Sequence, residues 1–154
     1  MKESIPPILR PDHVVPVAIS DLVAQFSLAV VSGGDGGSVT GISMNTNDLR
    51  AGDLFVAMPG LKTHGAKFAS KALELGAVAI LTDAEGLTLL EQANVPVLTR
   101  EDLRLRLGAL AAYVYGNLPG AMPKLFGTTG TNGKTSTSYI LEAILRQLGE
   151  VTGL

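Results

Sequence analysis

The chain has 154 residues, of which 46% are hydrophobic, and a formal net charge of −2 at pH 7, so it lacks the basic surplus that nucleic-acid binding requires. It contains no cysteine, which excludes disulfides and thiolate metal sites. It also shows neither a signal-peptide pattern nor the about 20 consecutive apolar residues that span a bilayer. We therefore expect a soluble, cytoplasmic protein with no membrane or nucleic-acid partner.

The start of the chain predicts an extended lead-in followed by a helix. Residues 1–17 are rich in proline, which disfavours regular structure. A helix is expected from Ser20 or Asp21 through Val31, because apolar residues then recur at helical spacing. Its inward side chains are predicted to be Leu22, Val23, Phe26 and Val30. The glycine-rich stretch 32–38 predicts a flexible loop.

The middle of the chain alternates between strand and helix patterns. Strands are predicted at 39–43, 53–58, 77–81 and 95–98, and helices at 66–75, 87–93 and 101–115. The strand at 53–58 is apolar enough to be buried on both faces of a sheet. This order predicts a small α/β domain with a mainly parallel sheet over 18–117. The turn residues 116–120 then mark a domain boundary.

Two polar loops follow the first two predicted strands. They are Ser43-Met44-Asn45-Thr46-Asn47-Asp48 and Pro59-Gly60-Leu61-Lys62-Thr63-His64-Gly65. Loops at strand ends are where open α/β sheets bind ligands. Their hydroxyls and amides, with the cationic Lys62 and the imidazole of His64, suit a polar, anionic small molecule. On residue types alone, ordinary surface turns are the simpler interpretation.

A phosphate-binding loop (P-loop) is predicted at Gly127-Thr128-Thr129-Gly130-Thr131-Asn132-Gly133-Lys134-Thr135. It lies between a predicted strand at 122–126 and a predicted helix at 134–149, and 151–154 is predicted to begin another strand. Lys134 supplies a cation for the terminal phosphates, and the hydroxyl of Thr135 is placed to ligate Mg²⁺. Residues 121–154 thus predict the first β–P-loop–α unit of a truncated P-loop ATPase domain.

The loop departs from the usual spacing at Thr128, where the general pattern has glycine. Gly130 and Gly133 remain to let the backbone approach a phosphate closely. The alternative interpretation is a glycine- and threonine-rich turn whose helix is capped by Thr131 or Asn132, with Lys134 solvated. The predicted strand and helix on either side favour the phosphate-binding interpretation.

Four stretches of the sequence carry a family resemblance. Gly52-Asp53-Leu54-Phe55-Val56-Ala57-Met58-Pro59-Gly60, His64-Gly65-Ala66-Lys67-Phe68 and Gly76-Ala77-Val78-Ala79-Ile80-Leu81 resemble the N-terminal domain of the Mur ligases. Thr129-Gly130-Thr131-Asn132-Gly133-Lys134-Thr135 is similar to the ATP loop of that family, which also lacks glycine at the position of Thr128. The resemblance is closest to the MurE-type ligases, and it covers about the first third of such an enzyme.

The resemblance implies a three-domain, ATP- and Mg²⁺-dependent amide ligase of peptidoglycan synthesis. Such an enzyme adds the third amino acid, meso-diaminopimelate in preference to L-lysine, to UDP-MurNAc-L-Ala-D-Glu. The D-Glu carboxylate is phosphorylated, and the incoming amine attacks the acyl phosphate. This chain would hold the UDP-substrate domain and the opening of the ATPase domain. By itself it is expected to be monomeric and inactive.

Site residues carry over by position. The substrate-binding residues fall at Met44, Thr46, Leu61, Lys62 and Thr63, with Ser43 and His64 as neighbours. The ATP loop comprises Gly130, Thr131, Asn132, Gly133, Lys134, Thr135 and Ser136, in which Lys134 and Thr135 are catalytic and Thr135 holds the metal. The family commonly has Asp-Ser-Arg where this chain has Asn45-Thr46-Asn47, so only the central hydroxyl is retained.

Three other functions are compatible with the sequence. The Mur ligase that adds D-Ala-D-Ala shares the Gly-Asp-Leu-Phe-Val-Ala run, but Thr131-Asn132 favours the third-residue enzyme. A non-catalytic module that binds nucleotide sugars would use the first domain alone. An unrelated P-loop ATPase or kinase would leave residues 39–68 unexplained.

Overall fold

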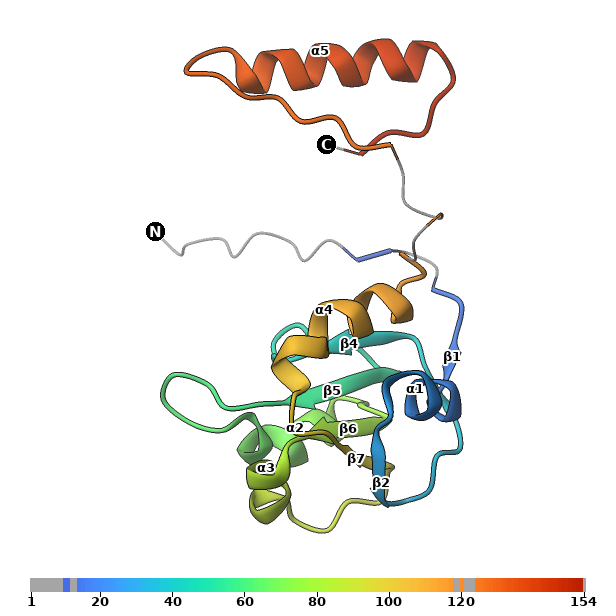
Figure 1. The fold of residues 1–154 in the computed structure, drawn as a ribbon, viewed down its shortest axis with the longest axis vertical. Coiled ribbons are helices and arrows are strands. Elements are labelled where there is room, and N and C mark those ends of the chain that lie inside the picture. Colours follow the sequence, from blue (N-terminus) through green and yellow to red (C-terminus); the bar gives the residue numbers. More distant parts are fainter. Residues whose placement is uncertain (1–9, 12–13, 118–119, 121–123, 154) are drawn as a thin grey trace. The chain divides into compact units, whose positions relative to one another are not determined.

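The structure is a computed structural model that describes residues 10–11, 14–117, 120 and 124–153 (Figure 1). The chain divides into two compact units, Met1–Ala121 (unit 1) and Met122–Leu154 (unit 2). Unit 1 carries all the strands found in the described residues, and unit 2 carries one helix, α5 (Lys134–Gln147). No helix in these residues is both long enough and apolar enough to cross a membrane.

The sheet of unit 1 has five strands in the order β2-β7-β6-β5-β4. Their bounds are Ala29–Ser32, Val97–Thr99, Ala79–Thr82, Asp53–Ala57 and Gly41–Ser43 in that order. The pairs β4–β5, β5–β6 and β6–β7 are parallel, and β2 pairs with β7 antiparallel. The predicted α/β class with a mainly parallel sheet is therefore confirmed. The short strands β1 (Val17–Ala18) and β3 (Ser38–Val39) form a separate antiparallel pair.

Helices cover both faces of this sheet (Figure 1). All of β5 is buried, and its side chains from Leu54 to Ala57 alternate between two apolar clusters. Leu54 and Val56 pack with α1 (Ile19–Phe26) and α4 (Leu103–Val114). Phe55 and Ala57 pack with the 3₁₀ helix η1 (Gly65–Phe68) and with α2 (Ala69–Glu74). Burial on both faces of the sheet is why β5 is apolar from Leu54 to Ala57.

The predicted helix from residue 20 through Val31 is wrong in its second half. α1 ends at Phe26, because Ser27 adopts a left-handed backbone conformation with φ 48°. The residues that follow form β2 beside β7, and Val30 is 41% exposed instead of facing inward. Leu22 is buried as predicted, and the ring of Phe26 packs edge-on against that of Tyr113. Pairing with β7 decides the structure here, since β-branched residues suit a strand.

The other predicted elements of unit 1 are present with shifted ends. The predicted strand at 39–43 is divided at Thr40 between β3 and β4. α3 (Ala84–Leu89) begins before the predicted helix at 87–93, because the side chain of Asp83 caps it by accepting the Gly86 N–H at 2.8 Å. α2 ends just before Gly76, which has φ 96°, as the glycine stop signal predicts.

In unit 2 the helix is found, and the predicted strands are wrong where the structure describes them. Lys124–Phe126 have no regular structure, and Leu125 and Phe126 are 78% and 62% exposed. The same holds for 151–153, while Met122, Pro123 and Leu154 lie outside the described residues. A strand requires a hydrogen-bonded neighbour, and the sheets of the described residues provide none for these segments. α5 accordingly buries none of its side chains.

An ion-pair network at the start of α4 predicts how unit 1 responds to acid. Hydrogen bonds from Arg100, which has the larger effect, and from Arg106 lower the pKa of Asp102 to about 2. Because the unfolded carboxyl titrates near pH ~4, this stabilisation is complete above that pH and is lost as the pH falls toward about 2. We expect Asp102→Asn to destabilise unit 1 at pH 7 and to have a much smaller effect at pH 2. Urea unfolding of both proteins across this range checks the prediction, and a pH-independent difference would contradict it.

Candidate functional site

The two predicted substrate loops leave the sheet at the same edge. Ser43 ends β4 and Ala57 ends β5, and these strands are parallel neighbours. The carboxyl ends of parallel strands are where open α/β sheets bind ligands. The loop at 58–64 projects from this edge of the sheet (Figure 1). The topology thus brings the bases of both loops together, as the sequence predicts.

The loop after β4 is organised by its own polar groups. The buried Ser43 Oγ donates to the Asn45 carbonyl at 2.9 Å and accepts the Asn45 N–H at 3.2 Å. The side-chain oxygen of Asn45 accepts the Asn47 N–H at 3.0 Å. An aspartate oxygen would accept the same bond, so this turn does not depend on whether residue 45 is Asn or Asp. Met44 is exposed and Thr46 half-buried at the surface of this loop.

Two pockets flank the loop after β4. One of about 520 Å³ is lined by Ser43, Met44 and Asn45 together with residues of α4. Another of about 370 Å³ is lined by Met44, Asn45, Thr46 and Asn47 with Phe55, Phe68 and Lys71. Neither pocket includes residues 61–64. The two predicted loops are therefore neighbours at one edge without lining either of these pockets jointly.

The loop after β5 is a short hairpin, residues 59–64. Pro59 and His64 form an antiparallel bridge, and the Gly60 N–H donates to the Thr63 carbonyl at 3.0 Å. Below them the Gly65 N–H donates to the Met58 carbonyl at 2.8 Å. Leu61 and Lys62 are exposed and Thr63 is half-buried, so the predicted contact residues stand at the tip of the hairpin.

His64 lies at the base of the hairpin, and its side chain is only 4% exposed. Its Nδ1 accepts the Ala66 N–H at 3.0 Å, which caps η1. Its Nε2 lies 3.0 Å from Asp83 Oδ1. Because Nδ1 accepts a hydrogen bond, Nε2 carries the ring hydrogen and donates it to the carboxylate. Both ring nitrogens therefore have partners within the chain.

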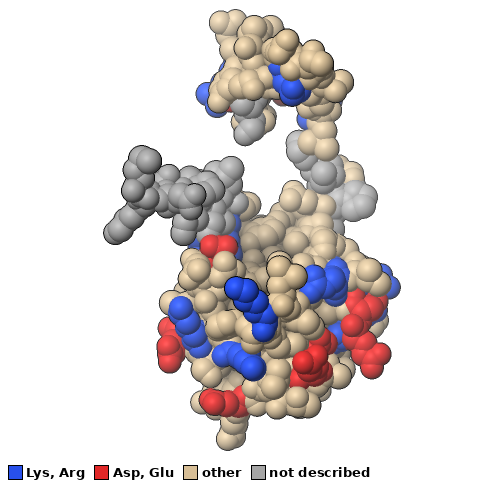
Figure 2. Space-filling view, turned by 90° about the vertical axis from the view of Figure 1, so that its left-hand side faces the viewer, with Lys and Arg blue, Asp and Glu red and all other residues tan. Residues whose placement is uncertain are grey.

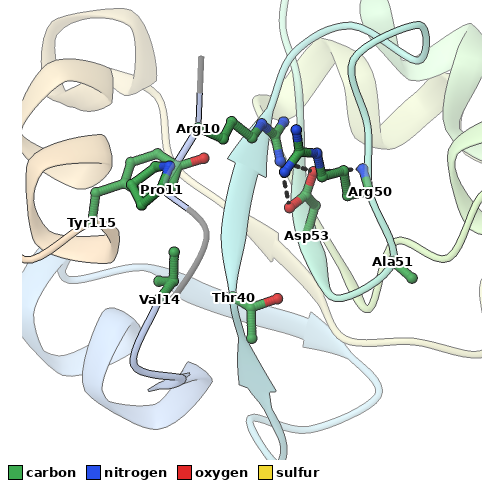
Figure 3. A pocket seen from close by; sticks show the side chains of 8 residues that line it. All are labelled: Arg10, Pro11, Val14, Thr40, Arg50, Ala51, Asp53 and Tyr115. Atoms are coloured by element: carbon green, nitrogen blue, oxygen red, sulfur yellow. Dashed lines mark hydrogen bonds and ion pairs between the residues drawn. The ribbon is translucent and has the colours of Figure 1, made fainter. Parts of the chain in front are cut away.

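An ion pair at the amino end of β5 was not predicted from the sequence (Figure 3). The Arg10 guanidinium donates to both carboxylate oxygens of Asp53, at 2.9 and 2.7 Å, and to the Asp48 carbonyl at 2.8 Å. The Arg10 and Asp53 side chains are 9% and 2% exposed. Asp53 belongs to the Gly-Asp-Leu-Phe run and begins β5, and Arg10 links its carboxylate to the Asp48 carbonyl at the end of the loop after β4. Nothing in the proline-rich context of Arg10 signals this contact.

A pocket of about 300 Å³ lies beside this ion pair. Figure 3 shows Arg10 above Asp53 and the Arg50 side chain extending toward the same carboxylate. The Arg50 backbone N–H also donates to Asp53 Oδ2, at 2.8 Å. The carboxylate is thus surrounded by donors, and it offsets part of the positive charge that the two guanidinium groups bring to this pocket.

In unit 2 the predicted phosphate loop has the backbone geometry that its glycines permit. Gly130 and Gly133 have φ values of 145° and 77°, in the region that favours glycine. α5 begins after Gly133, with no side-chain cap. Its first N–H groups, through Ser136, therefore have no partner within the helix and are free to meet an anion. Thr131 and Asn132 are exposed between the two glycines. These features fit a nucleotide phosphate.

Lys134 folds back over this loop, with its Nζ donating to the Gly130 carbonyl at 2.7 Å. Thr135 is exposed in the first turn of α5. Within the described ranges no three His, Asp or Glu side chains are grouped to hold a metal ion. A single hydroxyl fits Mg²⁺ of the kind that is held mainly by nucleotide phosphates and water.

The charge pattern of the surface agrees with the low net charge of the sequence. Figure 2 shows Lys and Arg side chains interspersed with Asp and Glu on one face of unit 1. Mixed signs at this spacing give no single-sign field for the phosphate backbone of a nucleic acid.

Comparisons with known proteins agree with the resemblance. The family described as "Mur ligase family, catalytic domain" matches residues 38–115. A UDP-N-acetylmuramyl-tripeptide synthetase of Leifsonia xyli is 47% identical over 149 residues, which are 97% of this chain and 29% of that protein. A UDP-N-acetylmuramoyl-L-alanyl-D-glutamate--2,6-diaminopimelate ligase of Streptomyces avermitilis is 42% identical over 145 residues, 94% of this chain and 28% of that protein.

Solved structures show the same fold. A UDP-N-acetylmuramoylalanyl-D-glutamyl-2,6-diaminopimelate--D-alanyl-D-alanyl ligase from Acinetobacter baumannii aligns with a TM-score of 0.63 at 24% identity, over 88% of this chain and 29% of that one. The chain thus spans less than a third of the length of the proteins it resembles. Since the family match covers half of its residues, the chain belongs to the Mur ligase family.

Proposed function

We propose that this chain is the N-terminal part of an ATP-dependent ligase that adds meso-diaminopimelate to UDP-MurNAc-L-Ala-D-Glu during peptidoglycan synthesis in the cytoplasm. The observation that carries the proposal is the identity of 42% to a protein named for that reaction, over 94% of this chain. An alignment of this extent includes both the loops of unit 1 and the phosphate loop of unit 2. The enzyme is proposed to act as a monomer.

Unit 1 is proposed to hold the uridine diphosphate end of the substrate at the carboxyl edge of its sheet. Met44 and Thr46 present a thioether and a hydroxyl beside the two pockets. Leu61, Lys62 and Thr63 stand at the tip of the hairpin, where Lys62 supplies a cation for the diphosphate. The buried hydroxyl of Ser43 supports the first loop from below.

Unit 2 is proposed to hold the ATP phosphates at residues 130–136. Lys134 would leave the Gly130 carbonyl for the terminal phosphates, and Thr135 would contribute its hydroxyl to Mg²⁺. With the metal bound, ATP supplies the phosphoryl group that activates the substrate carboxylate. The backbone N–H groups of the loop and of the first turn of α5 orient the phosphates through fixed dipoles. We propose that the isolated chain has no ligase activity.

An amide NMR titration with UDP-MurNAc-L-Ala-D-Glu tests this function, with UMP and AMP as comparison ligands. We expect saturable shifts at residues 44–47 and 61–64, partly reproduced by UMP and not by AMP. Lys62→Ala is expected to weaken binding of the UDP compound about tenfold, because a charge-assisted hydrogen bond is lost. Lys67→Ala, which removes an exposed lysine of η1, is the matched control. Absent shifts, or equal shifts with AMP, would contradict the proposal.

A further inference from the structure

The hairpin at 59–64 is held on both of its legs by helices from opposite faces of the sheet. On one leg, the Arg104 guanidinium of α4 donates to the Pro59 carbonyl at 2.6 Å. On the other leg, His64 reaches Asp83, the residue that caps α3. α4 packs on the face that carries Leu54 and Val56, whereas α3 lies beside η1 on the other face. Helices on both faces of the sheet therefore fix the direction in which the hairpin projects.

The contact at His64 is a continuous relay of hydrogen bonds. The Ala66 N–H donates to His64 Nδ1, and His64 Nε2 donates to Asp83 Oδ1, each at 3.0 Å. The same carboxylate oxygen accepts the Gly86 N–H at 2.8 Å. The ring thus connects the first turn of η1 to the first turn of α3. This relay requires one tautomer, with the hydrogen on Nε2.

The space around the ring is closed. A Cβ added at Gly86 would lie 2.6 Å from His64 Cε1 and would overlap Thr82 Oγ1. The Thr82 hydroxyl is itself fixed, because it donates to the Ala57 carbonyl at 2.7 Å at the end of β5. The imidazole is therefore buried against α3, with little room to change its orientation.

We propose that His64 is a positioning residue, which through Asp83 holds the hairpin at 59–63 in the geometry that receives the nucleotide. The nucleotide-binding part of this proposal rests on the proposed function, whereas the positioning part does not. Both ring nitrogens of His64 are hydrogen-bonded within the chain, so the ring affects ligand binding only through the residues whose positions it fixes. The groups it places are Leu61, Lys62 and Thr63.

The first test concerns the ligand-free chain. Two-bond ¹H–¹⁵N spectra of the histidine rings are expected to show His64 with hydrogen on Nε2 and a bare Nδ1, and His13→Gln assigns the two sets of signals. In His64→Asn, the shorter amide still accepts the Ala66 N–H but does not reach Asp83. We expect unchanged shifts in β5–β7 and lower heteronuclear NOE values at 60–63. The opposite tautomer, or unchanged order at 60–63, would overturn the proposal.

The second test uses partner variants and UMP. Asp83→Asn keeps an oxygen acceptor and should preserve the order of the hairpin, whereas Asp83→Ala should loosen it as His64→Asn does. Asp83→Ala also removes the cap of α3, but the double variant His64→Asn with Asp83→Ala should loosen the hairpin little further than Asp83→Ala alone, because the His64–Asp83 contact is lost in both. Glu85→Gln, an exposed acid of α3, is the control. We expect the Kd for UMP to rise about tenfold in His64→Asn, with shifts retained at 44–47.

The outcomes separate this role from the proposed function. A loosened hairpin with an unchanged Kd for UMP would overturn the nucleotide-binding part of the proposal for His64. If the wild-type chain binds neither the UDP compound nor UMP, both the proposed function and the nucleotide-binding part of the His64 proposal are wrong. The tautomer and the order of 60–63 would still decide whether His64 positions the hairpin.

Discussion

Arg10→Met is expected to lower the free energy of unfolding of unit 1 by about 3–5 kcal/mol, the usual cost of removing one partner from a buried ion pair. Methionine keeps most of the apolar stem of Arg10 and removes its charge. The Asp53 carboxylate would then stay buried with the Arg50 N–H as its remaining donor among the bonds described above. The Asp48 and Ile42 carbonyls would also lose a donor. Urea unfolding followed by circular dichroism measures the effect.

Two further variants make this prediction specific. Arg106→Met removes an exposed cation that pairs with Asp102, and it should cost less than about 1 kcal/mol. Arg10→Met combined with Asp53→Leu removes both charges, and it should be more stable than Arg10→Met alone. If Arg10→Met unfolds at the same urea concentration as the wild-type chain, the pair does not hold unit 1 together.

Gly86→Ala is expected to destabilise unit 1 by about 1–3 kcal/mol, although alanine is the better helix former. The new methyl group would overlap Thr82 Oγ1 and press on the ring of His64. Relief requires the Thr82 hydroxyl to abandon the Ala57 carbonyl, or α3 to move away from the sheet. Thermal unfolding of the variant and the wild-type chain measures the change.

Gly108→Ala in α4 is the matched comparison, because a Cβ there meets no atom within 4 Å. We expect this variant to be more stable than the wild-type chain by up to about 1 kcal/mol, since alanine loses less backbone entropy in a helix. Opposite signs at the two glycines would show that packing against His64 and Thr82 outweighs helix propensity in α3. Stabilisation by both substitutions would contradict the close packing described here.

The elements of unit 1 that are predictable from sequence are those fixed by local pattern. The apolar run at 53–58 predicts a buried strand, and Gly76 predicts the end of a helix; both follow from neighbouring residues alone. The end of α1 does not, because Val30 continues a helical pattern and yet pairs with Leu98 of β7, far along the chain. Leu125 and Phe126 form no strand, since an apolar segment also needs a neighbouring strand.

The candidate site is also predictable from the sequence only in part. Its location at the carboxyl edge follows from strand order, which the sequence suggests. The roles of individual polar residues do not follow, because burial decides them. Ser43 and His64 carry groups that suit a ligand, but both are buried and their polar atoms have partners within the chain. Arg10 has its partner 43 residues away, beyond any pattern read from its own segment.

The position of Arg10 also limits how far unit 1 can be shortened from its N-terminus. The sequence suggests a domain that starts at residue 18, yet the cation that neutralises Asp53 lies eight positions earlier. Proteolysis or truncation between Arg10 and Val17 would leave the buried Asp53 carboxylate at the amino end of β5 without the guanidinium that pairs with it. We therefore expect a stable fragment of unit 1 to start no later than Arg10.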